Sequence, residues 1–256
     1  MMEPVFTLER YFEQFASISI GSFYVLDVQQ KKICYAKSDD LFLCGFSTGD
    51  VLRLGYDFYS KVVFAEDLPL WMNMYGLVLQ YLNGQGEDRE ISCFSCTFRL
   101  QRTYAFNSRP VLQMIYHRVI PVWMDNELHY MLCCVESSTY KEPGHLCLHY
   151  KDGSTYREYN FTTKRWMQKE KETLTERERV LLMLGQQGKS TAEMSDILCK
   201  GHNTIRNQIK AMFSKLGKHT MLETIEFARN FRMIYPKWGI GSKMHSKNDP
   251  NLPKND

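Results

Sequence analysis

The side chains best suited to chemistry lie on one face of a predicted helix in the C-terminal third of the chain. At about 100° per residue, Ile205, Met212 and Leu216 fall on one apolar stripe and leave the opposite face polar. That face carries amide, hydroxyl and basic groups, which are the groups that proteins use on base edges and phosphates. The residues predicted to contact DNA are Asn203, Thr204, Arg206, Asn207, Lys210 and Ser214.

These residue types can either read a DNA duplex or only bind its backbone. A helix fits the major groove, where arginine donates two hydrogen bonds to guanine and asparagine pairs with adenine, each good pair discriminating by about 1 to 3 kcal/mol. Arg206 and Lys210 could equally bind phosphates, which set position and salt dependence but carry no sequence information. The alternative interpretation is an ordinary solvated helix face.

Three helix start signals surround this polar face. Thr175, Ser190 and Thr220 are each followed three residues later by glutamate and then by apolar residues at helical spacing. In such a capping box the hydroxyl and the carboxylate each satisfy a backbone N–H, which is typically worth about 1 kcal/mol. Gly188 and Gly217 are placed to end the first and third helices. We therefore expect four short helices, with the tight connection of a helix-turn-helix between the second and third.

The segment contains four characteristic sequence blocks, which are Leu174–Arg179, Gly188–Ser190, Thr204–Asn207 and Lys215–Gly217. These blocks resemble those of the LuxR-type helix-turn-helix domain of bacterial transcription regulators, over about residues 170 to 235. The resemblance implies that the third helix enters the major groove and that the fourth commonly pairs two protomers. It also implies that Arg206, Asn207 and Lys210 face the groove, and that Thr204 contacts the DNA backbone.

Three positions depart from the pattern of this family. Ala192 stands where a basic residue usually touches phosphate, Gly201 stands where a serine is usual, and Gln208 replaces a usual histidine. We expect these changes to leave the fold intact and to alter phosphate affinity and site preference.

The predicted fourth helix could pack on its own domain and still offer a surface to a second copy of the chain. Phe227 and Phe231 lie on one of its faces, and a second apolar face is wide enough for a dimer contact. The residues predicted to form the dimer helix contact are Met221, Leu222, Ile225 and Ala228.

The first part of the chain begins with short β-rich and helical segments. Ser22–Leu26 and Lys32–Ala36 read as a hairpin, and a helical stretch from Leu41 is expected to break at Gly49 and Gly55. A clear helix follows through about Leu82, with Asp67 as its N-cap.

Three long strands come next, at about 90–101, 110–122 and 128–136. Phe94 and Phe98 alternate with polar residues, which predicts a sheet with one wet face. This order of elements and the helix entry Glu66–Pro69 resemble a PAS domain over about residues 18–138. The resemblance implies a sensory or dimerising module with a cavity between the sheet and the helices.

Aromatic residues of this module could line a pocket for a small ligand, although an aromatic stripe of this kind is also typical of plain core. The pocket candidates are Trp71, Tyr75, Phe94, Phe98 and Tyr116. We predict no tightly bound cofactor and no metal. Cys93 and Cys96 would point to opposite faces of a strand, and His117 and His129 read as satisfied sheet residues.

A connection of 35 residues, 139–173, joins the two modules. The turn Lys151–Gly153 predicts a hairpin, and the charged run Thr162–Glu172 predicts a linker helix. Residues 1–17 are predicted to form an amphipathic helix, and residues 236–256 are predicted to be disordered.

The sequence as a whole predicts an α+β N-terminal domain, a PAS-like antiparallel sheet with flanking helices, followed by an all-α four-helix helix-turn-helix domain over 174–235. At 256 residues, 44% hydrophobic with a net charge of +3, the chain is long enough for two cores. It has no apolar run of membrane-spanning length. We expect a soluble, cytoplasmic bacterial protein and no disulfides.

The expected function is sequence-specific DNA binding by a dimeric transcription regulator. The expected partners are double-stranded DNA and a second copy of the chain, with RNA polymerase and an unknown small ligand as further candidates. The alternative is a protein-interaction modulator with weakened DNA binding, for which Ala192 and Gly201 are the hints. The sequence lacks a phosphate-binding glycine loop and a zinc motif, so we do not expect an enzyme.

Overall fold

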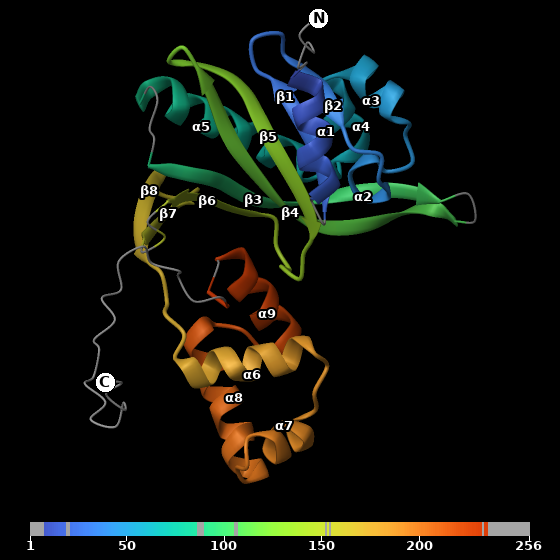
Figure 1. The fold of residues 1–256 in the computed structure, drawn as a ribbon. Helices are drawn as coiled ribbons and strands as arrows, with labels where there is room; N and C mark the ends of the chain where they lie inside the picture. Colours follow the sequence, from blue (N-terminus) through green and yellow to red (C-terminus); the bar gives the residue numbers. More distant parts are fainter. Residues whose placement is uncertain are drawn as a thin grey trace, which may run out of the picture.

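The computed structural model describes residues 8–18, 21–85, 90–104, 107–151, 153, 155–231 and 233–234. The N-terminal part is built on one antiparallel sheet of eight strands in the order β2-β1-β5-β4-β3-β6-β7-β8 (Figure 1). The strands are β1 (Ser22–Asp27), β2 (Lys32–Ala36), β3 (Ile91–Tyr104), β4 (Asn107–Met124), β5 (Glu127–Ser137), β6 (Gly144–Tyr150), β7 (Thr155–Asn160) and β8 (Arg165–Glu170).

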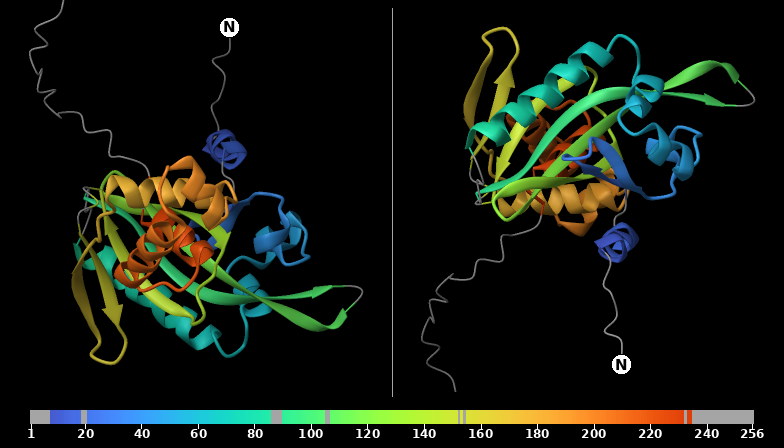
Figure 2. Two further views of the ribbon diagram at one scale, coloured as in Figure 1. Left: turned by 90° about the horizontal axis from the view of Figure 1, so that it is seen from below. Right: turned by 90° about the horizontal axis from the view of Figure 1, so that it is seen from above.

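Four helices cover one face of this sheet, which we call the inner face. The longest, α5 (Leu68–Gln85), lies against β3 and β6 (Figure 2). Fully buried rings such as Tyr24, Phe58 and Phe98 fill the space between the helices and the sheet. The arrangement is consistent with the predicted PAS-like fold. The shorter helices are α2 (Asp40–Leu43), α3 (Thr48–Leu54) and α4 (Asp57–Val62).

Asp67 fixes the start of α5 by a contact across to the sheet. Its carboxylate is 2% exposed and accepts from the backbone N–H of Arg99 at 2.8 Å and from Arg99 Nε at 2.9 Å. A buried carboxylate is tolerated only with such partners. Asp67 thus stands at the predicted N-cap position, where its carbonyl accepts from the N–H of Trp71 at 2.8 Å, but its side chain binds β3.

The opposite, outer face of the sheet is also covered. Helix α1 (Leu8–Ile18) packs apolar side chains on β1 and β5, and α9 (Met221–Asn230) lies on the other side of the sheet from α5 (Figure 2). Ser95 and Thr97 of β3 are consequently buried. The alternation along β3 is as predicted, but the expected wet face is not wet here, because other segments of the same chain pack over it.

The four helices predicted near the C-terminus are present below the sheet in Figure 1 and share an apolar core of their own. Gly185 allows a close approach within this core, since a Cβ there would lie 2.7 Å from Sδ of Met221. Gly217 has φ of +61° and ends the third of these helices, as predicted. The helices are α6 (Glu176–Gln186), α7 (Thr191–Ile197), α8 (His202–Leu216) and α9.

Helix α9 is joined to the outer face of the sheet by polar contacts. The carboxylate of Glu226 accepts from Ser138 Oγ at 2.8 Å and from the backbone N–H of Thr139 at 2.7 Å. Arg118 of β4 donates to Oδ1 of Asn230 at 3.1 Å. These contacts tie the helical part to the β5–β6 connection and to the central strand of the sheet.

Aromatic contacts extend the same interface. The ring of Phe231 lies 5.3 Å from that of His149 and 5.0 Å from that of Tyr156. The ammonium of Lys218 lies 4.8 Å from the ring centre of Tyr140. Because polar and aromatic contacts are mixed here, this interface resembles a contact between domains more than a single continuous core.

The structure corrects two boundaries. The predicted linker helix over Thr162–Glu172 is wrong: β8 extends the sheet there and pairs with β7, so the predicted hairpin carries a third strand. The helical stretch after Asp39 breaks at Cys44 and Gly45 instead of Gly49, which lies inside α3.

The predicted disordered tail and the first seven residues lie outside the described residues. Within those residues, no helix is long and apolar enough to cross a membrane.

Candidate functional site

Two capping boxes position the helices around the predicted DNA-contacting face. At α7, Ser190 Oγ accepts from the N–H of Glu193 at 3.3 Å, and the carboxylate of Glu193 accepts from the N–H of Ser190 at 2.8 Å. These hydrogen bonds, with Lys189, lower the pKa of Glu193 to about 2. Thr175 makes the equivalent box with Glu178 at α6. The first two predicted boxes are thus confirmed.

The third predicted box is only half formed. Thr220 Oγ accepts from the N–H of Glu223 at 3.2 Å, as expected. The carboxylate of Glu223 instead accepts from the N–H of His219 at 2.9 Å. The start of α9 therefore has one capping bond where the pattern predicted two.

A four-residue turn, Leu198–Gly201, joins α7 to α8. Cys199 takes a left-handed conformation, with φ of +48°, and its thiol is exposed, unlike the core thiols expected from the sequence. Lys200 closes the turn, because its N–H donates to the carbonyl of Ser195 at 3.0 Å and its carbonyl accepts from the Ser195 hydroxyl. Gly201 occupies the N-cap of α8 without a side-chain bond.

Helix α8 has the two faces that its sequence predicts. Ile205, Met212 and Leu216 are buried in the core shared by α6 to α9. Every residue predicted to contact DNA is exposed on α8, which leaves amide, hydroxyl and basic groups available to a partner. These residues are Asn203, Thr204, Arg206, Asn207, Lys210 and Ser214.

An ion pair links α8 to the start of α6. Lys215 Nζ lies 3.0 Å from the carboxylate of Glu178. Burial alone would raise the pKa of Glu178, but hydrogen bonds from Thr175 and Lys215 outweigh it and lower this pKa below its usual value. The same glutamate therefore caps α6 and binds α8.

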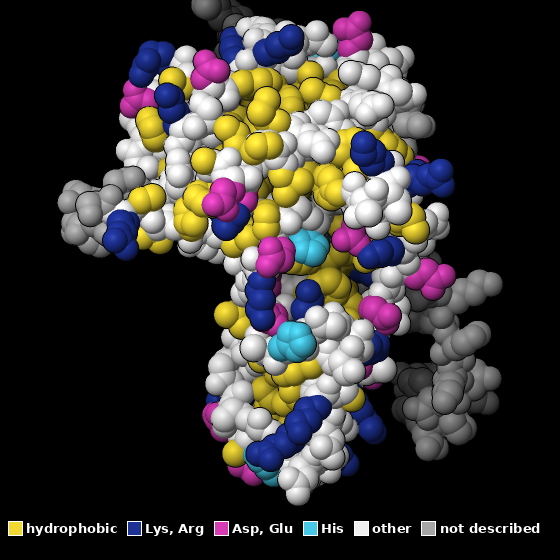
Figure 3. Space-filling view, turned by 180° about the vertical axis from the view of Figure 1, so that it is seen from behind, with side chains coloured by type: hydrophobic (Ala, Val, Ile, Leu, Met, Phe, Trp, Pro, Cys, Tyr) yellow, Lys and Arg dark blue, Asp and Glu magenta, His cyan; other side chains and the backbone are white. Residues whose placement is uncertain are grey.

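The basic residues near α8 divide into paired and unpaired groups. Lys189 pairs with Glu193 at 3.1 Å, and Lys215 pairs with Glu178. Among the described residues, no ion pair engages the exposed cations Arg177, Lys200, Arg206 and Lys210. Figure 3 shows dark blue side chains gathered at the lower end of the helical part, the end that holds α7 and α8 in Figure 1.

The predicted dimer residues of α9 are mostly turned inward. Ile225 and Ala228 are buried in the helical core, and Met221 packs against Gly185. Leu222 is 66% exposed and is the member of this set available to another molecule. A helix that packs on its domain with one face and on the sheet with another has little apolar surface left, which the sequence pattern could not show.

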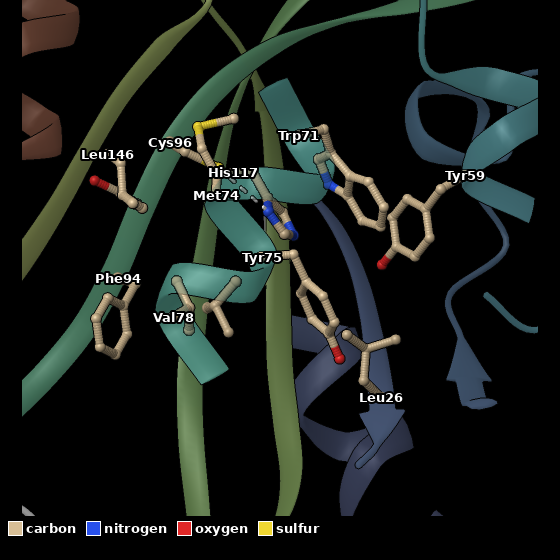
Figure 4. Close-up of a pocket in the computed structure, with 12 residues that line it drawn as sticks. Leu26, Tyr59, Trp71, Met74, Tyr75, Val78, Phe94, Cys96, His117 and Leu146 are labelled. Carbon is tan, nitrogen blue, oxygen red and sulfur yellow. Dashed lines mark hydrogen bonds between the residues drawn. The ribbon is translucent and has the colours of Figure 1, made fainter. Parts of the chain in front are cut away.

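A small cavity lies between α5 and the inner face of the sheet (Figure 4). Trp71 and Tyr75 of α5 and Phe94 of β3 line it, as predicted. Phe98 and Tyr116 do not line it: Phe98 is core, and Tyr116 lies on the outer face, where its ring stacks on Tyr140. The space for water-sized solvent is about 20 Å³, little more than the roughly 10 to 15 Å³ that one water needs.

A buried hydrogen-bonded chain borders this cavity. Tyr59 donates its hydroxyl to Tyr24 at 2.7 Å, and the Tyr24 hydroxyl lies 2.7 Å from Nε2 of His117. Nδ1 of His117 lies 3.9 Å from the thiol of Cys96. Burial lowers the pKa of His117 to about 3, so the ring is neutral at ordinary pH. The alternation of β4 could have placed His117 on the inner face, but nothing in the sequence pairs it with Tyr24.

Two other arrangements bear on chemistry. The described residues contain no group of three or more His, Cys, Asp or Glu side chains that could bind a metal ion. Ser95 Oγ lies 2.8 Å from Nε2 of His149, a pairing that could activate a serine. Ser95 is 1% exposed, so its hydroxyl is closed to bulk solvent in the structure.

No protein-family model matches the chain, and no curated protein matches it. Among solved structures, the chain is similar to Vibrio cholerae VqmA in a complex with a ligand and DNA, at 16% identity and a TM-score of 0.34, covering 90% of this chain and 92% of that one. It is similar to the Vibrio cholerae VqmA dimer without target DNA at 18% identity and a TM-score of 0.34, covering 90% and 91%. It is similar to the phage VqmA–DPO complex at 15% identity and a TM-score of 0.31, covering 88% of this chain and 88% of that one.

Proposed function

We propose that this protein is a sequence-specific DNA-binding transcription regulator in which α8 enters the major groove. The observation that carries the proposal is the exposed polar face of α8. Its six candidate residues are all solvent-exposed, while Ile205, Met212 and Leu216 of the same helix are buried. The helix is about as wide as the major groove, so one face can reach base edges while the other remains in the protein core.

In this proposal the residues of α8 have different roles. Asn207 lies near the centre of the exposed face and would pair with adenine, whereas Arg206 lies at its edge and would contact guanine or phosphate. Lys210 would add a base or phosphate contact one turn further along. We propose that the active form is a dimer, because two recognition helices about one helical turn of DNA apart give tight binding only when both are in register.

The PAS-like part would then serve as a sensor or as a dimerisation surface. The cavity in its described form has room for about one water, so an organic ligand would have to move side chains such as Trp71 or Tyr75. Exposed apolar residues of α1, Phe15 and Ile18, offer a candidate contact to a second copy. Binding of a small ligand and binding of RNA polymerase remain predictions. So does the location of the protein in the bacterial cytoplasm.

A variant comparison tests the readout role of α8. Purified full-length protein is incubated with a random-sequence duplex library, and the bound fraction is sequenced. Replacing Asn207 by Ala should relax preference at one base position by about 1 to 3 kcal/mol, because a bidentate contact is lost. Replacing the exposed Asn73 of α5 by Ala is the matched control and should change nothing. An unchanged preference in N207A would remove Asn207 from the readout role.

The second candidate function is a protein-interaction modulator with weak DNA affinity. Two observations favour it: Ala192 is exposed on α7 where the resemblance expects a basic residue, and Gly201 leaves the N-cap of α8 without a side-chain bond. Phosphate neutralisation makes binding steeply dependent on salt, whereas a protein contact need not be. Salt-independent association with another protein, together with no DNA selection, would favour this second function.

A further inference from the structure

Two exposed cations outside α8 flank the side of that helix that faces α6. Arg177 is in the first turn of α6, and Lys200 is in the turn that precedes α8. We propose that Arg177 and Lys200 form a phosphate-binding pair that positions α8 on DNA. The inference rests on the proposed function and adds to it two residues that the resemblance does not assign.

The two cations border the same hollow. The hollow provides about 230 Å³ of solvent space between α6 and α8, with Leu181 and Ile205 as its apolar floor. Gln208, which replaces the usual histidine of the family, also lines it. The floor is apolar and both Arg177 and Lys200 are exposed, so their charged ends are accessible to a phosphate.

Charge pairing separates these two residues from other nearby cations. Lys189 and Lys215 have carboxylate partners at 3.1 and 3.0 Å, and Lys218 lies over the rings of Tyr140 and Phe227. Ion pairs of this kind reduce the field available to a phosphate. Within the described part of the chain, Arg177 and Lys200 have no such pair.

The position of the hollow beside α8 favours phosphate over base contact. Gln208 lies about 100° around α8 from Asn207, which places the hollow beside the base-facing surface. A helix fills the roughly 12 Å width of the major groove, so its exposed face meets base edges and its flanks meet the sugar-phosphate strands. Thr204, implied by the resemblance to contact the backbone, is exposed on the same flank.

One acidic residue opposes this role and sharpens the test. Glu176 also lines the hollow, so Arg177 and Lys200 together with Glu176 leave a net charge of +1 there. Removing this carboxylate should strengthen DNA binding, and removing either cation should weaken it. A purely structural role for the three side chains would not produce opposite signs.

The test is the salt dependence of binding to a duplex selected by the wild-type protein. In R177A and in K200A the negative slope of log K against log salt should become less steep by about 1. Each variant should bind DNA about eightfold more weakly at 0.1 M salt, equally on selected and scrambled duplexes. E176Q should tighten binding on both. R53A on α3 and K61A on α4 are the matched controls, because each removes one arginine or lysine charge from the N-terminal part. Both should leave the salt slope unchanged.

The outcomes separate this inference from the proposed function. A salt-dependent wild type with unchanged slopes in R177A and K200A overturns the phosphate pair and leaves DNA binding intact. A change confined to one base position would make these residues base readers and also overturns it. A wild type without salt-dependent DNA binding overturns the proposed function and the pair with it. Circular dichroism of each variant confirms that it is folded.

Discussion

His117 lies on the inner face of the sheet, where its ring connects the hydroxyl of Tyr24 with the thiol of Cys96. The side chain is buried, and burial lowers its pKa to about 3. A neutral imidazole can accept from the tyrosine with one nitrogen and donate with the other, which a protonated ring cannot do. The hydrogen-bonded chain along the cavity therefore depends on His117 remaining neutral.

This burial predicts a specific pH dependence of stability. In the unfolded chain a histidine has a pKa near 6.5, so it binds a proton below that pH. In the folded protein His117 binds this proton only near pH 3. Stability should therefore fall by about 1.4 kcal/mol for each pH unit between about 6 and 4. Urea unfolding of the wild type and of H117Q measures the difference, which should shrink as pH falls.

The exposed His219 provides the control for this measurement. H219Q leaves the buried hydrogen-bonded chain around His117 intact. A constant difference between wild type and H117Q from pH 7 to pH 4 would contradict a buried, neutral His117.

At the scale of elements, most helix starts and strands are readable from the sequence, but the surroundings of each element are not. The capping boxes at Thr175 and Ser190 form as predicted because both partners are local in sequence. The sequence of β8 predicts a helix, although its charged residues fit a helix or a strand equally well. Pairing with β7 makes this segment a strand. Ile225 and Ala228 have the right spacing for a dimer face, but the spacing does not tell which core they join.

The difference between complete and half-formed boxes predicts different energies. T175A removes the hydroxyl that accepts from Glu178 N–H and donates to its carboxylate at 3.0 Å, and should destabilise the helical part by about 1 kcal/mol. T220A removes a single bond and is the matched comparison, since Glu223 already binds His219. We expect it to cost about half as much. Urea unfolding followed by circular dichroism compares them, and a larger cost for T220A would refute this interpretation.

At the scale of the whole molecule, α9 joins the two parts of the chain. Glu226 and Asn230 contact the sheet, while α8 keeps its polar face exposed on the other side of the helical core. Arg118, which binds Asn230, neighbours His117 on β4, so one strand carries a cavity residue on its inner face and an α9 contact on its outer face. No local sequence pattern predicts contacts between residues this far apart.

Removal of the Glu226 carboxylate should loosen this interface. The variant E226A loses two charge-assisted hydrogen bonds, each worth about 1.5 to 3 kcal/mol, whereas E226Q keeps an acceptor and is the control. Lys141 and Lys218 line one hollow at the interface, so an amine cross-linker should join them in the wild type. The yield should fall several-fold in E226A and less in E226Q. Equal yields in all three proteins would show that Glu226 does not secure α9.

The most direct measurement of the central claim is selection from a random-sequence duplex library by the full-length protein at two salt concentrations. A dimer that reads DNA through α8 should enrich a motif with two-fold-related half-sites about one helical turn apart, at both salts. Weak binding that disappears at the higher salt, with no motif enriched at either, would contradict the account, because phosphate contacts alone give affinity without sequence preference.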